Sequence, residues 1–449
     1  MVTQWRLAHR YRAAVKRHRK NKGHISQIKR PMCALFPDII EDLECKRITN
    51  LVIDEAQCIK NCESKTYHAA HHLGGQAEMV VLMSGTILAN NWEDLWSPLT
   101  FAKDNPVPDF DTFANIFADV QEDGDVDDPG PQGLARLRQL LNSFVIGRGE
   151  QVIKDKLPEL MIKTIGFELT SGEKTDVNTS MALYSQKMAG SIKKRGRRAA
   201  GKGKGGKKHP GAGLGDLSNA RQISLHPLLA ETTKFSKNNQ FFSAEAMDDI
   251  PADKVRLFNE WHANASLKSL EDLHSSRTRT LVTLVYKIID VYPGENIMIF
   301  SESTLFQALL RLIFFKTAEP IECLVFNGDT PEEKREGVLT EFLSSQGQKL
   351  LLIGRGVGGV GLNIQGASIV IITEPWWCES WEVQAIKRAH RRGANLDTPI
   401  KVYKLVATNS TVDDKFVTAS QDKHDTNMMI AAGFVRADGV SPEVEYDIS

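Results

Sequence analysis

The sequence lacks any long apolar run. No stretch of its 449 residues approaches the roughly 20 consecutive apolar residues that a membrane-spanning helix needs. The N-terminal segment 1–20 is basic, but no apolar core follows it, as a secretory signal would require. We therefore expect a protein that is neither secreted nor inserted in a membrane.

Cysteine is scarce as well. The six cysteines are few for this length and include no C-x-x-C pair, so we expect no disulfide framework and a reducing compartment. Cys58 and Cys62 lie near His68, His71 and His72 and could suggest zinc, but their spacing fits no common zinc finger.

Net charge is absent, because 56 Lys and Arg residues balance 56 Asp and Glu residues. The distribution is more informative than the sum. Basic residues cluster in 6–30 and again in KKRGRRAAGKGKGGKK, residues 193–208, which contains no acid. Either stretch could contact phosphate or act as a nuclear address, and a solvated flexible loop is the alternative interpretation. The Gly- and Lys-rich composition around it cannot bury a core, so we expect disorder over 190–215.

Strong apolar strands are present in two parts of the chain. ITNLVIDEAQ, residues 48–57, is a β-branched run that ends in two carboxylates, and MVVLMSGT, residues 79–86, ends in a polar turn. The segment 65–73 between them has a helical pattern. A strand, a helix and a further strand of this kind predict a buried parallel pair.

A second alternating series begins near residue 270. Its predicted strands cover 296–301, 322–328, 349–354, 368–375 and 401–407, and its predicted helices cover 304–315, 331–343 and 380–391. Repeated βα units predict a parallel sheet with helices on both faces. Ligands of such sheets bind at the carboxyl ends of the strands, where the unusual residues of this chain lie.

Two candidate groups follow the first pair of strands. An acid such as Asp54 at a strand end can hold Mg²⁺ on the phosphates of a nucleotide, and the neighbouring Glu55 can orient or deprotonate water. Ser84-Gly85-Thr86 follows the next strand, where small hydroxyl residues can reach the acids. The alternatives are solvated acids and an ordinary helix cap.

A third candidate group lies in VGGVGLNIQGASIVIITEPWWCESWEVQAIKRAHRRG, residues 357–393. The glycines there permit close backbone approach to a phosphate or a nucleic-acid strand. Gln384, Arg388 and Arg391 follow at three- and four-residue spacing, which predicts one shared helix face. Two guanidinium groups on one face suit the stabilisation of charge on a transferring phosphoryl group, and an ordinary basic helix is the alternative.

Taken in order, VIDEAQCIKN, LMSGTILANN, FNGDTPEEKR, GGVGLNIQGAS, EPWW and QAIKRAHRRG resemble the successive motifs of superfamily-two helicases of the Swi/Snf type. LPEL at 157–160 and ARQISLHPLL at 220–229 resemble the connecting region of that family. The resemblance covers residues 47–230 and 270–420. It implies an α/β fold with two RecA-like lobes, ATP and Mg²⁺ as cofactors, movement along duplex DNA, and a nuclear protein of chromatin remodelling or DNA repair with nucleosomes or repair proteins as possible partners.

The resemblance also implies a role for each matching residue. Asp54 would bind Mg²⁺, Glu55 would activate water, and Ser84, Gly85 and Thr86 would couple the lobes. The remaining roles fall on Arg388 and Arg391 at the phosphates with Gln384 in support, on Gly359 and Gly361 at the nucleotide, and on Asn90, Gly328, Thr330 and Gly358 at the DNA backbone.

The expected domains follow from these matches. Residues 1–46 are basic and unassigned, 47–165 form part of a first lobe, 166–269 form a helical connecting region, 270–420 form the second lobe, and 421–449 form a tail.

One expected motif is missing. The sequence contains no G-x-x-x-x-G-K-[ST] loop to hold phosphates, and only 53 residues precede Asp54, so we expect an incomplete first lobe and weak ATP binding. Three interpretations stay open: a fragment of a full ATPase, a natural pseudo-ATPase that acts as a DNA-binding or scaffold module, and a chain whose function is lost.

Overall fold

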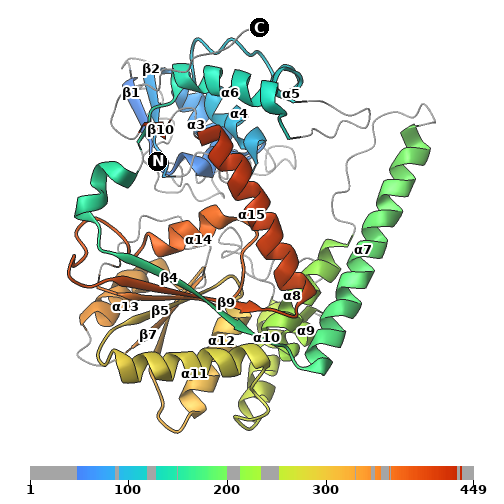
Figure 1. Ribbon diagram of the computed structural model, residues 1–449, viewed down its shortest axis with the longest axis vertical. Helices are drawn as coiled ribbons and strands as arrows, with labels where there is room; N and C mark the ends of the chain where they lie inside the picture. The colour runs from blue at the N-terminus through green and yellow to red at the C-terminus, as the bar shows by residue number, and fades with distance from the viewer. Residues whose placement is uncertain are drawn as a thin grey trace, which may run out of the picture. The chain divides into compact units, whose positions relative to one another are not determined.

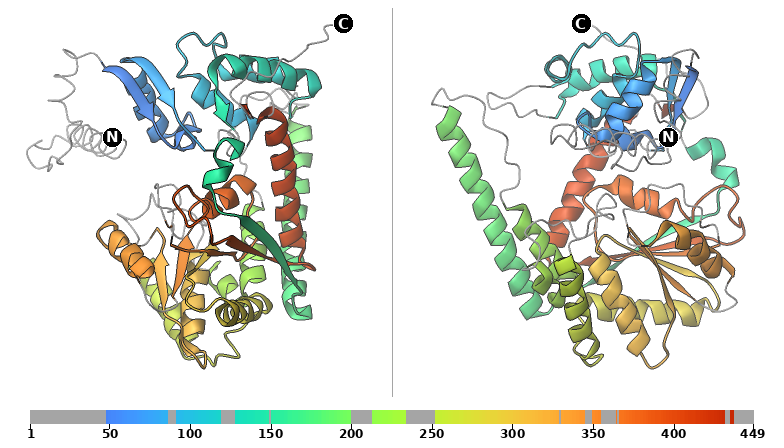
Figure 2. Two further views of the ribbon diagram at one scale, coloured as in Figure 1. Left: turned by 60° about the vertical axis from the view of Figure 1, so that its left-hand side comes forward. Right: turned by 180° about the vertical axis from the view of Figure 1, so that it is seen from behind.

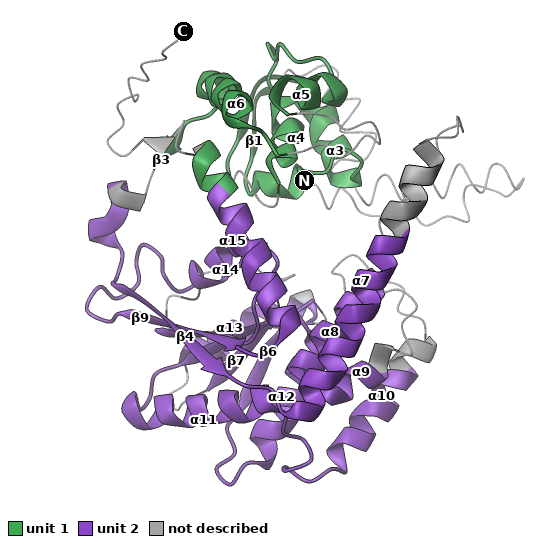
Figure 3. Ribbon diagram, turned by 45° about the vertical axis from the view of Figure 1, so that its right-hand side comes forward, with its two compact units in different colours: residues 1–147, 426–436, 441–449 green, residues 148–425, 437–440 purple. Residues whose placement is uncertain are grey.

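The computed structural model forms two compact units (Figure 3). Unit 1 comprises residues 1–147, 426–436 and 441–449, and unit 2 comprises residues 148–425 and 437–440. The structure describes residues 48–85, 91–118, 128–148, 150–199, 213–233, 252–328, 330–344, 349–354, 364, 366–431 and 435–436.

Unit 1 contains a parallel two-stranded sheet and several helices. Strands β1 (Ile48–Ile53) and β2 (Ala77–Leu82) pair in parallel, with Val52 opposite Val81. The chain between them forms the 3₁₀ helix η2 (Ala56–Ile59) and helix α3 (Lys65–Gly74), which confirms the predicted order of strand, helix and strand. The unit continues through η3 (Trp92–Leu95), α4 (Trp96–Leu99), α5 (Phe110–Phe117) and α6 (Pro131–Phe144).

The two faces of the β1–β2 sheet differ in burial. On one face, Ile53 and Leu82 pack against a buried cluster that includes Tyr67 of α3 and Phe101. The opposite face exposes apolar side chains, among them Val52 at 55% and Met79 at 53% of their full accessible surface. Parallel sheets normally have both faces covered, so this apolar face is unusual.

Unit 2 is built on a six-stranded sheet in the order β4-β9-β8-β5-β7-β6. Its strands are β4 (Leu160–Phe167), β5 (Ile297–Ser301), β6 (Cys323–Phe326), β7 (Leu350–Gly354), β8 (Ile369–Ile372) and β9 (Ile400–Ala407). Every neighbouring pair is parallel, which confirms the predicted parallel sheet.

Helices cover both faces of the unit 2 sheet (Figures 1 and 2). Ile297 and Ile299 pack toward α11 (Ser276–Val291) and α12 (Thr304–Lys316), whereas Met298 and Phe300 pack toward α13 (Glu332–Ser344) and α14 (Glu379–Ile386). Successive side chains of a strand alternate between faces, and here both faces are buried, so the strands are continuous apolar runs.

The remaining helices of the chain are α7 (Ser171–Ala199), α8 (Leu214–Leu225), α9 (Pro227–Thr233), α10 (Ala252–Ser266) and α15 (Thr411–Ala431). Short elements are β3 (Gly147–Arg148), η4 (Glu150–Lys156) and β10 (Val435–Arg436). In the part of the chain that the structure describes, no helix combines the length and apolar character of a membrane span.

Three predicted boundaries differ from the structure. Strand β4 pairs along its whole length with β9, so residues 160–165 belong to the sheet of unit 2 and not to the first lobe. Helix α15 continues past the expected domain end at 420. Helix α7 extends to Ala199, so the prediction of disorder from residue 190 is wrong for 190–199, because Lys, Arg and Ala are good helix formers. The rest of the basic stretch, 200–212, lies outside the described residues.

Candidate functional site

The acids at the end of β1 stand on a sharp turn. Glu55 has φ 52° and ψ 51°, the left-handed conformation that a residue with a side chain rarely adopts. The Asp54 Oδ1 atom accepts a hydrogen bond from the Glu55 amide at 2.9 Å, and the Ala56 amide donates to the Met83 carbonyl oxygen at 2.9 Å. A strained backbone that is fixed by its surroundings is a common feature of functional sites.

A short chain of side-chain hydrogen bonds joins the ends of β1 and β2. The Ser84 hydroxyl donates to Gln57 Oε1 at 2.6 Å, and Gln57 Nε2 donates to Glu55 Oε2 at 2.6 Å. We call Ser84, Gln57 and Glu55 the strand-end relay. Gln57 was quoted in the sequence motif but given no role, and its position two residues after Glu55 is the signal that could have identified it.

Asp54 is suited to a hard cation. Its side chain is exposed beside the turn, and carboxylate oxygen is the protein ligand that Mg²⁺ prefers. The described residues contain no cluster of three or more His, Cys, Asp or Glu side chains that could hold a metal ion. Mg²⁺ commonly takes one or two carboxylates, with water and phosphate oxygens completing its shell, so the single carboxylate fits such an ion.

Several predicted site residues lie outside the described part of the chain. Of the predicted segment Ser84-Gly85-Thr86, the structure still describes Gly85, which is exposed, and a Cβ atom placed on it would meet nothing within 4 Å. The undescribed residues are Thr86 and Asn90 after Ser84 and Gly358, Gly359 and Gly361 in the glycine turn.

The predicted helix face of Gln384, Arg388 and Arg391 is wrong in its geometry. Helix α14 ends at Ile386, and only Gln384 lies within it. The Arg388 carbonyl oxygen accepts the Ile364 amide at 3.2 Å instead of continuing the helical ladder. Arg388 is 7% exposed whereas Arg391 is exposed, so the two side chains have different surroundings.

The other predicted DNA contacts lie after strand β6. Gly328 is half-buried, and Thr330 is 9% exposed. The Thr330 hydroxyl accepts the Asn327 amide at 3.0 Å and donates to the Val325 carbonyl oxygen at 3.2 Å. Its polar side-chain atom therefore stabilises this loop from within, and contact with DNA stays a prediction.

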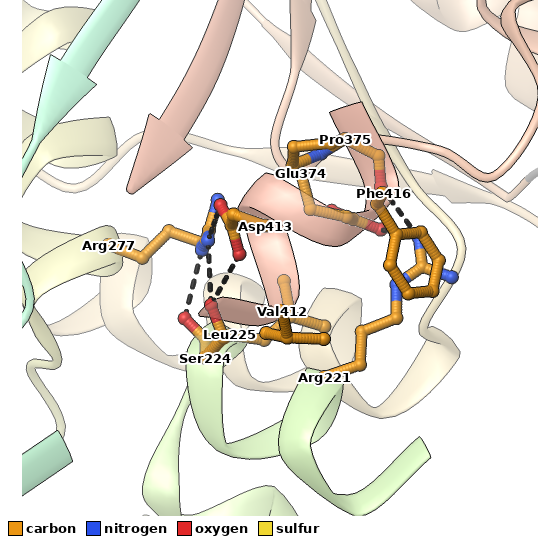
Figure 4. A pocket seen from close by; sticks show the side chains of 9 residues that line it. All are labelled: Arg221, Ser224, Leu225, Arg277, Glu374, Pro375, Val412, Asp413 and Phe416. Atoms are coloured by element: carbon orange, nitrogen blue, oxygen red, sulfur yellow. Dashed lines mark hydrogen bonds and ion pairs between the residues drawn. The ribbon is translucent and has the colours of Figure 1, made fainter. Parts of the chain in front are cut away.

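A buried ion pair that the sequence analysis missed lies at the carboxyl edge of the unit 2 sheet. Arg277 is fully buried, and its Nη2 atom lies 2.6 Å from Asp413 Oδ2 (Figure 4). Its Nη1 atom donates to the Thr373 carbonyl oxygen at 2.7 Å. Ser224 in α8 contributes its carbonyl oxygen to the Arg277 Nε atom and its hydroxyl to Asp413. Arg277 thus joins α8, α11, the end of β8 and α15, which no local spacing in the sequence reveals.

Two known family models match the chain. Residues 34–229 match the SNF2-related domain, and residues 279–393 match the helicase conserved C-terminal domain. Both matches agree in position with the motifs that the sequence analysis identified.

Several curated proteins are similar to this chain over most of its length. The chain is 24% identical to the mouse DNA excision repair protein ERCC-6-like 2 over 82% of its own length, and 25% identical to the ATP-dependent helicase fft1 of Schizosaccharomyces pombe over 82%. It is 23% identical to the transcription regulatory protein SNF2 of Saccharomyces cerevisiae over 88%. These matches cover only 24%, 38% and 21% of the relatives' own lengths, respectively.

Solved structures give a weaker likeness. The Sulfolobus solfataricus SWI2/SNF2 ATPase core in complex with double-stranded DNA is 20% identical, with a TM-score of 0.40 over 91% of this chain and 76% of that one. The C-terminal part of the Fun30 ATPase domain is 18% identical, with a TM-score of 0.41 over 62% of this chain and 97% of that one.

Proposed function

Because the chain belongs to the family of SNF2-related ATPases with a helicase C-terminal domain, we propose that it serves ATP-driven movement along duplex DNA. The family binds ATP and Mg²⁺. The strand-end relay is the observation that carries the proposal. Its hydrogen bonds join the ends of β1 and β2 and fix the orientation of the Glu55 carboxylate, and a group that activates water must be held in a defined position.

In this proposal each residue of unit 1 has a separate task. Asp54 would hold Mg²⁺, Glu55 would accept a proton from the attacking water, and Ser84 would couple the site to the end of β2 through its hydrogen bond with Gln57. ATP supplies the transferable phosphoryl group, and most of the acceleration of its transfer comes from positioning and electrostatics. Gly85 and Thr86 extend the segment that couples the lobes.

In the proposal, the residues of unit 2 supply positive charge at the phosphates and contacts with the DNA backbone. Arg388 and Arg391 would act on the phosphates, supported by Gln384, and Gly359 and Gly361 would contribute to nucleotide binding. Contacts with the DNA backbone are assigned to Asn90, Gly328, Thr330 and Gly358. Backbone contacts grip DNA without reading its sequence, as a protein that moves along it needs.

A second candidate function is a pseudo-ATPase that binds DNA or serves as a scaffold. The observation that favours it is the absence of a G-x-x-x-x-G-K-[ST] motif from the sequence. The amides and the lysine of such a loop provide much of the binding energy for the phosphates. A chain without them keeps the acids and arginines but holds the triphosphate weakly.

The exposed face of the β1–β2 sheet supports an incomplete first lobe. Val52, Met79, Val81 and Met83 present apolar surface to water, and a pair of strands alone is only marginally stable. Further strands or helices of an ATPase lobe would cover this surface and would bring a phosphate loop with them. We therefore propose that the chain forms part of a larger ATPase.

The cellular process is a finer part of the proposal. The relatives include a DNA excision repair protein and a transcription regulatory protein, so the proposal covers both chromatin remodelling and DNA repair. We propose a nuclear location, with nucleosomes or repair proteins as partners. Nuclear exclusion of the full-length protein would contradict this part without affecting the ATPase proposal.

The testing experiment compares DNA-stimulated ATP hydrolysis by three proteins. These are the chain itself, the chain extended with a family-type N-terminal part that contains the phosphate loop, and the extended chain with Glu55→Gln. We expect turnover only in the second protein. An inactive extended chain that still binds DNA would favour the pseudo-ATPase.

A further inference from the structure

Arg221 connects helix α8 to the segment between β8 and α14. Its Nη2 atom donates to the Pro375 carbonyl oxygen at 3.1 Å, and its Nη1 atom forms an ion pair with the Glu302 carboxylate. The guanidinium carbon lies 4.5 Å from the centroid of the Phe416 ring (Figure 4). One side chain of α8 therefore contacts the segments after β5 and β8 and also α15.

A buried carboxylate lies beside this guanidinium. Glu374 is 2% exposed, and its Oε1 atom accepts the Glu302 amide at 2.7 Å and the Ser301 hydroxyl at 3.1 Å. Burial raises the pKa of Glu374, and the positive charge of Arg221, with Nη2 4.0 Å from Oε1, opposes that rise. Arg221 thus compensates an acid that is otherwise costly to bury.

The Pro375–Trp376 peptide group is held at both ends. Arg221 binds its carbonyl oxygen, and on the other side its N–H donates to Glu382 Oε1 at 3.0 Å. Glu382 belongs to α14, and its Oε2 atom lies 2.7 Å from Lys404 Nζ in β9. The indole of Trp376 is 1% exposed, so the residue after this peptide is also fixed in the core.

This peptide leads directly into the helix that carries Gln384 and then into the turn that carries Arg388. We propose that Arg221 is a positioning residue: it fixes the Pro375–Trp376 peptide and so sets the orientation of α14 and the Arg388 turn. The inference rests on the proposed function, in which those two residues act at the nucleotide. Through Arg221, helix α8 would therefore help to position Gln384 and Arg388.

Arg277 provides the contrast that defines this role. Both arginines bind a carbonyl oxygen of the same segment, Arg277 at Thr373 and Arg221 two residues later at Pro375. Arg277 is fully buried, whereas the Arg221 side chain is 21% exposed. When Arg221 is removed, Glu374 loses a nearby positive charge but keeps its hydrogen bonds from the Glu302 amide and the Ser301 hydroxyl, and water can enter where the Arg221 side chain was partly exposed. We therefore expect a local loosening and not unfolding.

Amide hydrogen exchange on the full chain tests the link directly. In Arg221→Ala we expect the amides of Trp376 and of α14 to exchange about tenfold faster, since one charge-assisted hydrogen bond is lost, while the β4–β9 amides keep their protection. Arg221→Lys should give a smaller increase, because an ammonium group cannot bind Pro375 and Glu302 in the same fork geometry. Arg256→Ala, at an exposed arginine of α10, is the matched control and should change nothing.

Turnover by the extended chain gives the second measurement. Arg221→Ala should lower kcat about tenfold with little change in KM, because the orientation of Gln384 and Arg388 and not the capture of nucleotide is altered. Absence of turnover in the unsubstituted extended chain would reject the proposed function alone. Unchanged amide exchange at Trp376 and α14 in Arg221→Ala would overturn the positioning role. An equal increase in exchange rate throughout unit 2 would also overturn it, because the effect would then not be local.

Discussion

The Gln57 amide nitrogen lies 2.6 Å from a carboxylate oxygen of Glu55, so a neutral side chain determines where this acid points. The same amide accepts the Ser84 hydroxyl at 2.6 Å. Gln57 is suited to this position because an amide can donate at one end and accept at the other. A movement of Ser84 at the end of β2 can therefore change the orientation of Glu55 at the end of β1 through Gln57.

Gln57→Leu should reduce turnover without unfolding unit 1. Leucine preserves the approximate volume but removes both hydrogen bonds, so Glu55 loses its fixed direction. We expect kcat of the extended chain to fall about 10- to 100-fold, as the loss of a charge-assisted hydrogen bond implies. DNA-stimulated phosphate release measures the effect.

The matched control for this substitution is Gln76→Leu, at an exposed glutamine after α3 whose Nε2 atom lies 3.2 Å from His72 Nε2. It should leave kcat unchanged. A Gln57→Leu variant with full kcat would show that Glu55 orientation does not depend on the relay.

The parts of the fold that follow local patterns were predicted well. The apolar runs around Ile299, Leu352 and Ile371 are strands because each buries both faces, and the βα alternation predicted a parallel sheet. The membership of β4 in that sheet was missed, because its partner β9 lies more than 200 residues later and only tertiary pairing joins them.

The candidate site divides in the same way. Asp54, Glu55 and Ser84 stand at strand ends, where the sequence predicts them. The end of α14 was missed because the Arg388 and Ala389 amides donate to carbonyl oxygens three residues earlier, at Ala385 and Ile386, and the spacing of polar residues does not reveal this change from helix to turns. Arg221 lies in a quoted motif, yet its role depends on the distant Pro375 carbonyl oxygen.

Arg277→Met should destabilise unit 2 strongly. The substitution leaves the Asp413 carboxylate buried without its cation, and removing one partner of a buried pair costs about 3–5 kcal/mol. Urea unfolding, followed by tryptophan fluorescence, measures the loss of the free energy of unfolding. Arg279→Met is the control, because its pair with Glu271 is exposed and therefore contributes little to stability. Equal effects of the two substitutions would contradict the structural role of Arg277.

Acid should destabilise unit 2 through His226. Burial lowers the pKa of His226 to about 4, while its Nε2 atom lies 2.8 Å from the Leu273 carbonyl oxygen and its Nδ1 atom accepts the Leu228 amide. The unfolded chain has the ordinary pKa of 6.5, so it binds more protons than the folded chain between pH 6.5 and about 4. The stability is complete above pH 6.5 and decreases by about 3 kcal/mol as the pH falls through this window.

Urea unfolding at a series of pH values measures this dependence. In His226→Gln the titrating group is absent, so the decrease between pH 6.5 and 4 should be about 3 kcal/mol smaller than in the unsubstituted chain. Parallel pH curves for the two proteins would show that His226 is not the responsible group.

DNA binding should be independent of base sequence and sensitive to salt. The candidate DNA-binding residues are expected to contact phosphates and not base edges. On duplex DNA, each phosphate that the protein neutralises adds about −0.9 to the slope of log affinity against log salt concentration. Replacing the basic residues of 193–208 with glutamine should make this slope less steep if the segment contacts DNA. Fluorescence anisotropy with two unrelated duplexes measures both properties. Affinity that follows base sequence and hardly changes with salt would contradict the assignment.

The chain by itself should hydrolyse ATP poorly, although Asp54, Glu55, Arg388 and Arg391 are all present. Without a phosphate loop the nucleotide is not held in the ground state, and positioning provides most of the rate in phosphoryl transfer. Adding a family-type phosphate loop should restore turnover, and Glu55→Gln in that extended chain should abolish it, because the amide cannot accept the proton of water. Robust turnover by the unextended chain that Glu55→Gln abolishes would show that another part of this sequence binds the phosphates.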